Sequence, residues 1–175
     1  MLWSDAIKTN AATAIATAVL GFICLAGLAG CGFALRGSYE LPYKGIFVAA
    51  PSNSAVASLV RRELGTTSTK PVTTANAADA ELTISVERRD RQILSLSGAG
   101  RVREYELKLL VRYQFAESGG RVLIPTSEIQ LTRILTYNDS LIIAKQQEEA
   151  LLYTDMEKDI VGQILRRMAA VKHVN

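Results

Sequence analysis

Cysteine and histidine are almost absent from this sequence. Its 175 residues include two cysteines, Cys24 and Cys31, and a single histidine, His173, close to the carboxyl end. A His/Cys metal site needs several ligands at set spacings, and a hydroxyl or thiol nucleophile needs a base beside it. The scarcity of both residue types argues against a metal centre and against histidine-assisted catalysis.

Motifs of the common enzyme classes are also missing. The chain contains no HExxH, CxxC, GxSxG or P-loop pattern. The stretch GAGRVR begins like a dinucleotide-binding turn, but Arg103 stands where the third glycine belongs and a predicted strand follows. Glu148 and Glu149 are adjacent carboxylates in a charged helical run, which is typical of a solvated surface. We therefore expect a protein that is not an enzyme and has no metal or soluble cofactor.

Charge of either sign is missing from a long amino-terminal stretch. No residue between Lys8 and Arg36 is charged, and the run AATAIATAVLGFICLAGLAG consists mostly of small and apolar residues. A secretory signal needs a basic start, an apolar stretch and small residues at the cleavage point. A membrane-spanning helix needs about 20 apolar residues, which this run also supplies. A buried core helix is disfavoured because the run has no polar face.

The end of this run distinguishes the first two alternatives. Leu28, Ala29, Gly30 and Cys31 resemble a bacterial lipobox, where the cysteine thiol is lipidated and the chain is then cut before it. A thiolate is the nucleophile suited to accept a diacylglyceryl group. We therefore predict a lipoprotein signal peptide over residues 1–30, with Cys31 as a lipid anchor that carries acyl and diacylglyceryl groups. The alternative is an uncleaved amino-terminal anchor with an incidental cysteine.

The residues after the anchor predict its location and the domain organisation. Residue 32 is glycine, whereas an aspartate there commonly signals retention at the inner membrane; the sorting rule thus implies the periplasmic face of the outer membrane. Residues 31–45 show no sustained period and are predicted to be a lipidated tether, and residues 46–175 a single domain. The net charge of +3 is too small to indicate nucleic-acid binding.

The first part of this domain predicts a strand, a helix and a second strand. The run GIFVAAPS is typical of a short buried strand, and Asn53 and Ser54 are good N-caps for the helical stretch AVASLVRREL. Residues 66–79 predict an exposed loop. The next run, AELTISVE, alternates as a half-buried strand does. This order predicts a parallel pair with a right-handed crossover.

Two longer strands and a helix complete the predicted fold. EYELKLLVRYQF places apolar residues at every second position from Tyr105 to Phe115, and SEIQLTRILTY repeats the alternation after a Gly-Gly turn. Pro125 marks a bulge or an edge strand. From about Ala144 the period becomes helical. The predicted fold class is α+β, a two-layer sandwich of two helices packed on a four-stranded, mostly antiparallel sheet in βαβββα order.

Such a fold leaves one sheet face open, and basic residues are predicted there. If the strands on either side of the glycine-rich turn pair as a hairpin, one register places Arg91 opposite Lys108 and the other places Arg89 opposite Lys108. Like charges directly opposite each other are mildly destabilising, a cost that a bound phosphate would remove. With Arg101 and Arg103 in the turn region, they form a candidate anion site. Solvated arginines on a wet sheet are the alternative.

Three segments of the sequence resemble one protein family. The lipobox is followed at once by GFALRG, which completes a CGFxLRG opening; a predicted strand ends in LTRILTYND, and the last predicted helix contains AKQQEEALLYTDMEKDIVGQIL. In these features the chain is similar to the lipopolysaccharide-assembly lipoproteins of the LptE family. The resemblance covers nearly all of the chain after Cys31.

The resemblance implies a function and a set of partners. LptE-like proteins lie in the lumen of the large outer-membrane β-barrel LptD as its plug, assist its folding, and with it deliver lipopolysaccharide to the outer leaflet. Lipopolysaccharide carries phosphates, so the resemblance makes it the expected ligand of the candidate anion site formed by Arg89, Arg91, Lys108, Arg101 and Arg103. The alternative is a lipoprotein accessory subunit of another envelope transport or assembly complex, without lipopolysaccharide binding.

Overall fold

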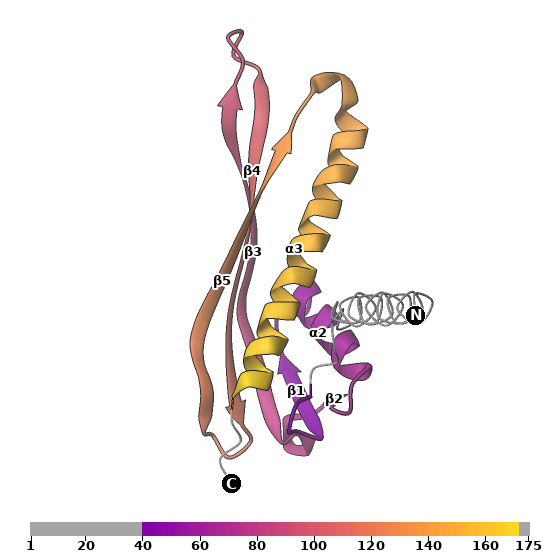
Figure 1. Ribbon diagram of the computed structural model, residues 1–175, viewed down its shortest axis with the longest axis vertical. Helices are drawn as coiled ribbons and strands as arrows, with labels where there is room; N and C mark the ends of the chain where they lie inside the picture. Colours follow the sequence, from indigo (N-terminus) through magenta and orange to yellow (C-terminus); the bar gives the residue numbers. More distant parts are fainter. Residues whose placement is uncertain (1–39, 172–175) are drawn as a thin grey trace, which may run out of the picture. The chain divides into compact units, whose positions relative to one another are not determined.

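The computed structural model describes residues 40–171, so the predicted signal peptide, Cys31 and most of the predicted tether lie outside the described residues. The described chain forms strands and two α-helices, with short 3-10 helices in two connections (Figure 1). In chain order the elements are β1 (Gly45–Ala49), α2 (Ala55–Gly65), β2 (Lys70–Val72), η1 (Ala75–Ala77), β3 (Ala80–Leu96), β4 (Val102–Glu117), β5 (Val122–Thr136), η2 (Asp139–Leu141) and α3 (Ile142–Ala170).

The strands join in a single sheet with the order β2-β1-β3-β4-β5. β1 is parallel to β2 and to β3, whereas β3, β4 and β5 are antiparallel neighbours. The predicted fold class, two helices packed on a mostly antiparallel sheet in βαβββα order, is confirmed, as is the parallel first pair. The predicted strand number is wrong, because the sheet has five strands and not four.

The additional strand, β2, lies within the segment 66–79 that was predicted to be an exposed loop. It is three residues long and has Pro71 at its centre. A segment this short shows no alternation that sequence analysis could detect. Only its pairing with β1 makes it a strand, and its place at the edge of the sheet tolerates the missing N–H of Pro71.

The alternation predicted for β4 and β5 is confirmed. Along β4, Leu107, Leu109, Val111, Tyr113 and Phe115 are fully buried. On β5 the polar residues that alternate with the apolar ones are all exposed: Thr126, Glu128, Gln130, Thr132 and Thr136. One face of the sheet therefore contributes to the core and the other is polar.

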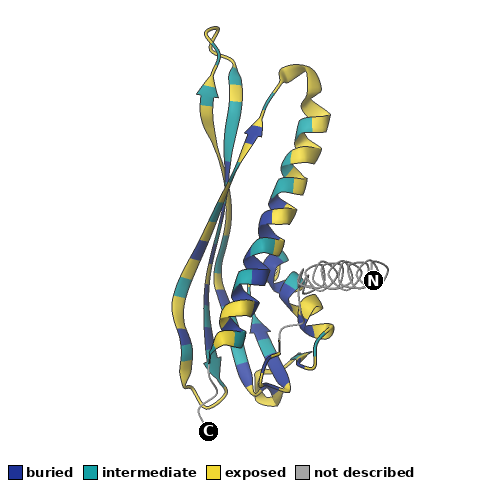
Figure 2. Cartoon of the chain, in the orientation of Figure 1, coloured by how far each residue is buried: buried dark blue, intermediate teal, exposed yellow. Residues whose placement is uncertain are grey.

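The two helices lie on the same side of the sheet, and their buried residues complete one core layer (Figure 2). The Ser54 hydroxyl accepts a hydrogen bond from the Ala57 N–H at 2.9 Å and so caps α2, as predicted. In α3 the predicted apolar stripe is buried, with Met156, Ile160 and Ile164 fully inaccessible to solvent. The first three turns of α3 contribute no buried residue.

The core also extends into the segment predicted to be a tether. Leu41 and Tyr43 are buried, and the Tyr43 ring packs edge-on against Phe115 with the centroids 5.4 Å apart. The buried Thr69 hydroxyl donates to the Tyr43 carbonyl at 2.7 Å. Residues from Leu41 onward therefore belong to the folded domain.

A β-bulge in β3 changes which of its residues face the helices. Ile84 pairs with Tyr113, but Val86 pairs with Arg112, so Ser85 is an extra residue with no partner in the ladder. Because side chains alternate with a period of two, one inserted residue moves every later side chain to the opposite face. The bulge thereby determines the placement of the basic residues that follow it.

Candidate functional site

Arg89 and Arg91 lie on the face of the sheet that α3 covers. Arg89 is opposite Leu109 and Arg91 is opposite Leu107 in the β3–β4 ladder, and both leucines are fully buried. Neither arginine is opposite Lys108, so both predicted registers are wrong. The predictions assumed an uninterrupted hairpin, whereas the bulge shifts the pairing by one residue.

Arg89 forms an ion pair with Glu157 of α3. The Glu157 side chain is 6% exposed and that of Arg89 is 50% exposed, so the pair joins a buried carboxylate to a guanidinium that still reaches water. The Arg89 guanidinium also lies over the Tyr153 ring, 5.1 Å from its centroid. Both interactions of the Arg89 guanidinium are therefore with residues of α3, and they help to hold this helix on the sheet.

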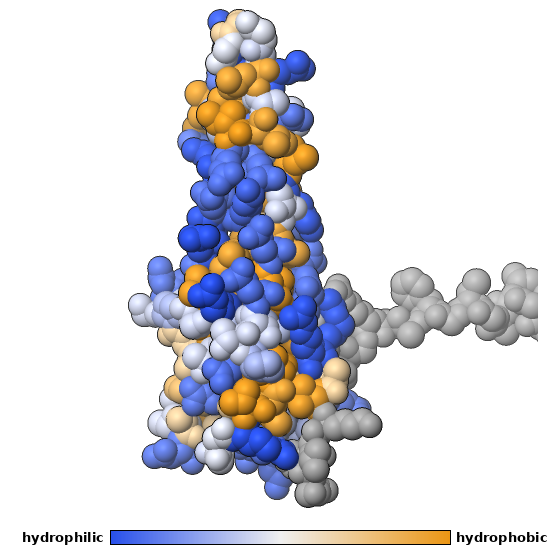
Figure 3. Space-filling view, turned by 90° about the vertical axis from the view of Figure 1, so that its left-hand side faces the viewer, coloured by the Kyte–Doolittle hydropathy of each residue, from blue (hydrophilic) through white to orange (hydrophobic). Residues whose placement is uncertain are grey.

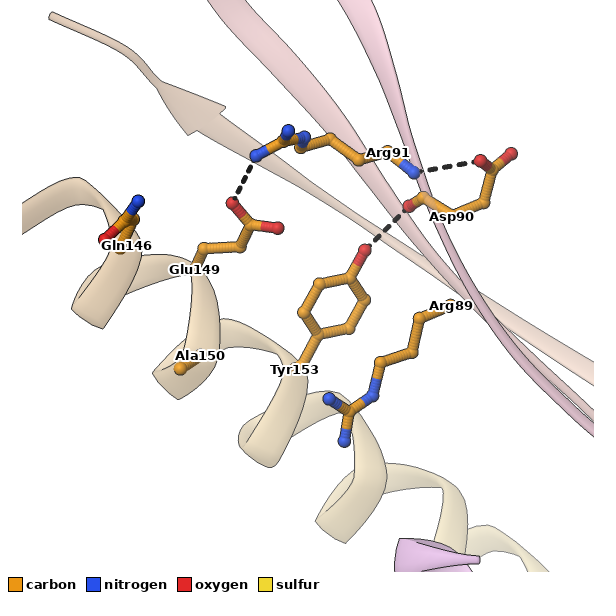
Figure 4. Close-up of a pocket in the computed structure, with 7 residues that line it drawn as sticks. All are labelled: Arg89, Asp90, Arg91, Gln146, Glu149, Ala150 and Tyr153. Atoms are coloured by element: carbon orange, nitrogen blue, oxygen red, sulfur yellow. Dashed lines mark hydrogen bonds and ion pairs between the residues drawn. The ribbon is translucent and has the colours of Figure 1, made fainter. Parts of the chain in front are cut away.

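Arg91 makes similar contacts with Glu149, which lies about two turns nearer the start of α3 than Glu157 does. Its Nη1 lies 2.9 Å from the Glu149 carboxylate, and the guanidinium is 4.8 Å from the centroid of the Tyr105 ring. The hydrogen bond to Glu149 raises the pKa of Arg91. Figure 4 shows Arg91 directed at Glu149, and the Tyr153 hydroxyl donating to the Asp90 carbonyl at 2.7 Å.

These contacts border an open groove of about 520 Å³ between β3 and α3. Burial, followed by the nearby Glu149 carboxylate, raises the pKa of the Tyr153 phenol, which therefore stays protonated as the donor to Asp90. The charged groups that line the groove are Arg89, Asp90, Arg91 and Glu149. Cations and anions are balanced there, so the groove has no net attraction for an anion.

Lys108 lies on the opposite, polar face of the sheet. It is paired with Asp90 across the β3–β4 ladder. Its Nζ is 2.6 Å from the Glu106 carboxylate and donates to the Gln92 side chain at 3.1 Å. The structure therefore does not bring Lys108 together with the two arginines that were predicted to share an anion site with it.

Arg101 and Arg103, the other two predicted site residues, lie at one end of the domain, away from the contacts of Arg89 and Arg91. Arg101 lies in the β3–β4 turn, where Gly100 has a φ of +75°, and Arg103 lies near the start of β4. Both side chains are exposed, and neither forms an ion pair within residues 40–171. They help to line a cavity of about 500 Å³ together with Ser97 and residues 136–140, among which Asp139 is the acidic residue.

Apolar side chains gather at the same end of the domain. We call this end, which consists of the β3–β4 turn, the end of β5 and the start of α3, the distal end. Figure 3 shows them just below the tip of the hairpin. Among the described residues, the exposed large apolar side chains of this end are Ile93, Leu94, Leu96, Ile134, Leu141, Ile142, Ile143 and Leu151. An exposed apolar cluster marks an interaction site more often than single exposed residues do.

Sequence analysis identified the two arginines of the distal end but missed its apolar cluster and the loop after β5. The signal was present in the adjacent pair Ile93-Leu94 and in the run from Leu141 to Ile143, which break the alternation expected of a strand or an amphipathic helix. Cations beside apolar side chains suit an amphiphile that has an anionic head group and hydrocarbon chains.

Comparison with known proteins shows which family the chain belongs to. The model of the family described as LptE, lipopolysaccharide-assembly, matches residues 43–168. The chain is 41% identical to an uncharacterized lipoprotein B from Nitrosomonas europaea, with a TM-score of 0.69 over 79% of this chain and 91% of that one. It is 27% identical to the rare lipoprotein B from Shewanella oneidensis, with a TM-score of 0.63 over 72% and 94%.

A minor lipoprotein from Acinetobacter baumannii shares the fold, at 20% identity and a TM-score of 0.60 over 75% of this chain and 94% of that one. A search of curated proteins found no match. Neither helix in the described part is both long and apolar enough to cross a bilayer. Since the family model spans most of the folded domain, the chain belongs to the LptE family of lipopolysaccharide-assembly proteins, which are non-enzymatic lipoproteins.

Proposed function

We propose that this protein is an outer-membrane lipoprotein that plugs an LptD-type β-barrel, helps it to assemble, and assists the delivery of lipopolysaccharide to the outer leaflet. Membership of the LptE family is the observation that carries this proposal. A plug in a water-filled lumen needs a small folded domain with a polar exterior. The exposed polar residues of the open sheet face, such as Thr126, Gln130 and Thr132, are compatible with that requirement.

Cys31 is the proposed attachment point, on the periplasmic face of the outer membrane. One acyl chain holds a protein only marginally, whereas the several chains of a mature bacterial lipoprotein make the anchor effectively permanent. The folded domain begins by Leu41, so only a short segment separates it from the lipid. When extended, the nine residues between Cys31 and Leu41 can span up to about 30 Å, so the domain can enter the barrel while the lipid stays in the inner leaflet.

We assign lipopolysaccharide contact to the distal end, with Arg101 and Arg103 as the residues that bind phosphate. Their guanidinium groups need not leave an existing ion pair to bind an anion, unlike those of Arg89 and Arg91. The exposed apolar side chains of the distal end supply contacts for the hydrocarbon part of the same molecule. Binding through Arg89, Arg91 or Lys108 stays a prediction, and it would require their present partners to be displaced.

The test is a pair of charge reversals at the distal end. The variant Arg101→Glu/Arg103→Glu should bind purified lipopolysaccharide about tenfold more weakly or worse, because each change replaces attraction by repulsion. Arg62→Glu/Arg166→Glu is the matched control, since both of these arginines are exposed on helices. Equal affinity of the distal variant and the wild type would remove Arg101 and Arg103 from the site.

A further inference from the structure

The two edges of the sheet are protected to very different degrees. β2 forms one edge and is only three residues long, with Lys70 and Pro71 in it. Short length, lysine and proline are the usual devices that prevent an edge strand from pairing with another chain. β5 forms the other edge and is 15 residues long. Its one proline, Pro125, and the adjacent bulges lie near its beginning.

From Ser127 to Thr136 the β4–β5 ladder is regular, which determines where the backbone groups of β5 point. The Tyr137 N–H donates to the Arg103 carbonyl. Because hydrogen-bonded positions alternate in an antiparallel ladder, the odd-numbered residues of β5 bond to β4 and the even-numbered ones point to the open edge. Gln130, Thr132 and Ile134 thus direct their N–H groups outward.

The charges along this part of β5 are already neutralised within the domain. Glu128 pairs with Arg112 at 2.9 Å, and Arg133 pairs with Asp159 at 2.9 Å. The remaining residues from Ile129 to Thr136 are apolar, Thr or Gln. A long, regular edge with a high strand propensity and no unpaired charge attracts another strand that is itself uncharged.

We propose that this edge pairs with an extended, uncharged segment of the barrel subunit, which adds a strand beside β5; this inference rests on the proposed function. Main-chain hydrogen bonds to Gln130, Thr132 and Ile134 supply the affinity, as in other cases of strand addition. The side chains of β5 that lie beside the added strand determine which residue types the barrel segment carries. It carries apolar residues opposite Leu131 and Leu135, and Thr, Ser or Gln on the other face.

The test distinguishes the contribution of the backbone N–H to binding from that of the side chain at the same position. Full-length tagged chain is co-expressed with the barrel subunit as wild type, Gln130→Pro, Thr132→Pro, and the matched controls Gln130→Ala and Thr132→Ala. Proline removes an N–H that β4 does not use, which an edge strand tolerates, whereas alanine keeps it. The alanine variants should recover the barrel as the wild type does, and the proline variants about fivefold less or worse.

Amide deuterium exchange of the wild type provides a second measurement that needs no variant. The amides of Gln130, Thr132 and Ile134 should exchange about tenfold more slowly in the complex than in the free chain. Three results would overturn the proposal: equal recovery by the proline and alanine variants, equal exchange in both states, or protection already present in the free chain. The last would mean that residues 1–39 or a second copy covers the edge. A wild type that recovers no barrel would instead refute the proposed function as well.

Discussion

At the scale of single residues, the ion pair between Arg89 and Glu157 is asymmetric, and the asymmetry predicts which substitution is costly. Glu157 is buried, whereas half of the Arg89 side chain is exposed. Arg89→Met leaves a carboxylate without a partner inside the protein, and we expect it to lower the free energy of unfolding by about 2–3 kcal/mol. Glu157→Gln leaves an arginine that can turn to water, and we expect a loss of about 1 kcal/mol.

Urea unfolding followed by circular dichroism measures both losses. The double variant Arg89→Met/Glu157→Gln is the control, because it removes the charge and its partner together. It should be more stable than Arg89→Met alone. If Glu157→Gln proved the more damaging single substitution, the burial-based explanation would fail.

The lowered pKa of Asp79 predicts how the stability of the domain depends on pH. One carboxylate oxygen accepts the N–H groups of Lys44 at 2.8 Å and Gly45 at 3.0 Å, and these backbone hydrogen bonds lower the pKa of Asp79 from its ordinary value of 3.8. A lowered folded-state pKa means that the stabilisation is complete above the unfolded-state pKa and is lost as the pH falls through the folded-state pKa.

The variant Asp79→Asn should therefore be less stable than the wild type at pH 7. The carboxylate is exposed to solvent, so we expect a difference of about 1 kcal/mol and no more. The difference should shrink as the pH falls below about 5 and through the lowered folded-state pKa, where the wild-type carboxylate takes up a proton. Thermal unfolding of both proteins across this range measures it, and a difference that does not change with pH would contradict the assignment.

At the scale of secondary-structure elements, the bulge at Ser85 determines how the hairpin meets α3. Deletion of Ser85 would remove the extra residue and leave the other pairs of the ladder as they are, so Arg89 and Arg91 would stay on the face that α3 covers. We therefore expect the deletion to cost only about 1 kcal/mol, because it removes an exposed residue and keeps the ion pair between Arg89 and Glu157.

The substitution Ser85→Ala is the matched control for this deletion. The Ser85 side chain is exposed and donates one hydrogen bond, to the Arg112 carbonyl at 3.3 Å. The loss of this hydrogen bond should change the free energy of unfolding by about 0.5 kcal/mol or less. Chemical denaturation compares the two variants, and a deletion that costs about 3 kcal/mol or more, as the loss of the partner of Glu157 would, would contradict this pairing.

The same bulge explains why the elements were predictable and the site was not. The alternation in β4 and the helical stripe of α3 follow from burial on one face, which the pattern of apolar residues records directly. The position of a bulge depends on a tertiary pairing, and Ser85 lies in a run, AELTISVE, that alternates without interruption. A hairpin register derived from alternation alone therefore placed Arg89 and Arg91 on the wrong face.

At the scale of the whole domain, the two ends differ in character. The end that contains β1, β2 and α2 has a complete core that begins at Leu41. The distal end has exposed apolar side chains and two arginines, Arg101 and Arg103, that form no ion pair with any residue from 40 to 171. A domain with a complete core at one end and exposed amphipathic surface at the other is compatible with the proposed plug that also contacts a lipid.

We propose that this lipoprotein works within an outer-membrane barrel. The most direct measurement is isolation of the tagged full-length protein from outer membranes in mild detergent, with intact-mass analysis of the captured chain. We expect a large barrel in stoichiometric amount and a triacylated chain that starts at Cys31. A triacylated chain captured without a barrel, or with an ATP-driven inner-membrane complex, would contradict the proposed plug, and an uncut chain starting at Met1 would contradict the proposed anchor.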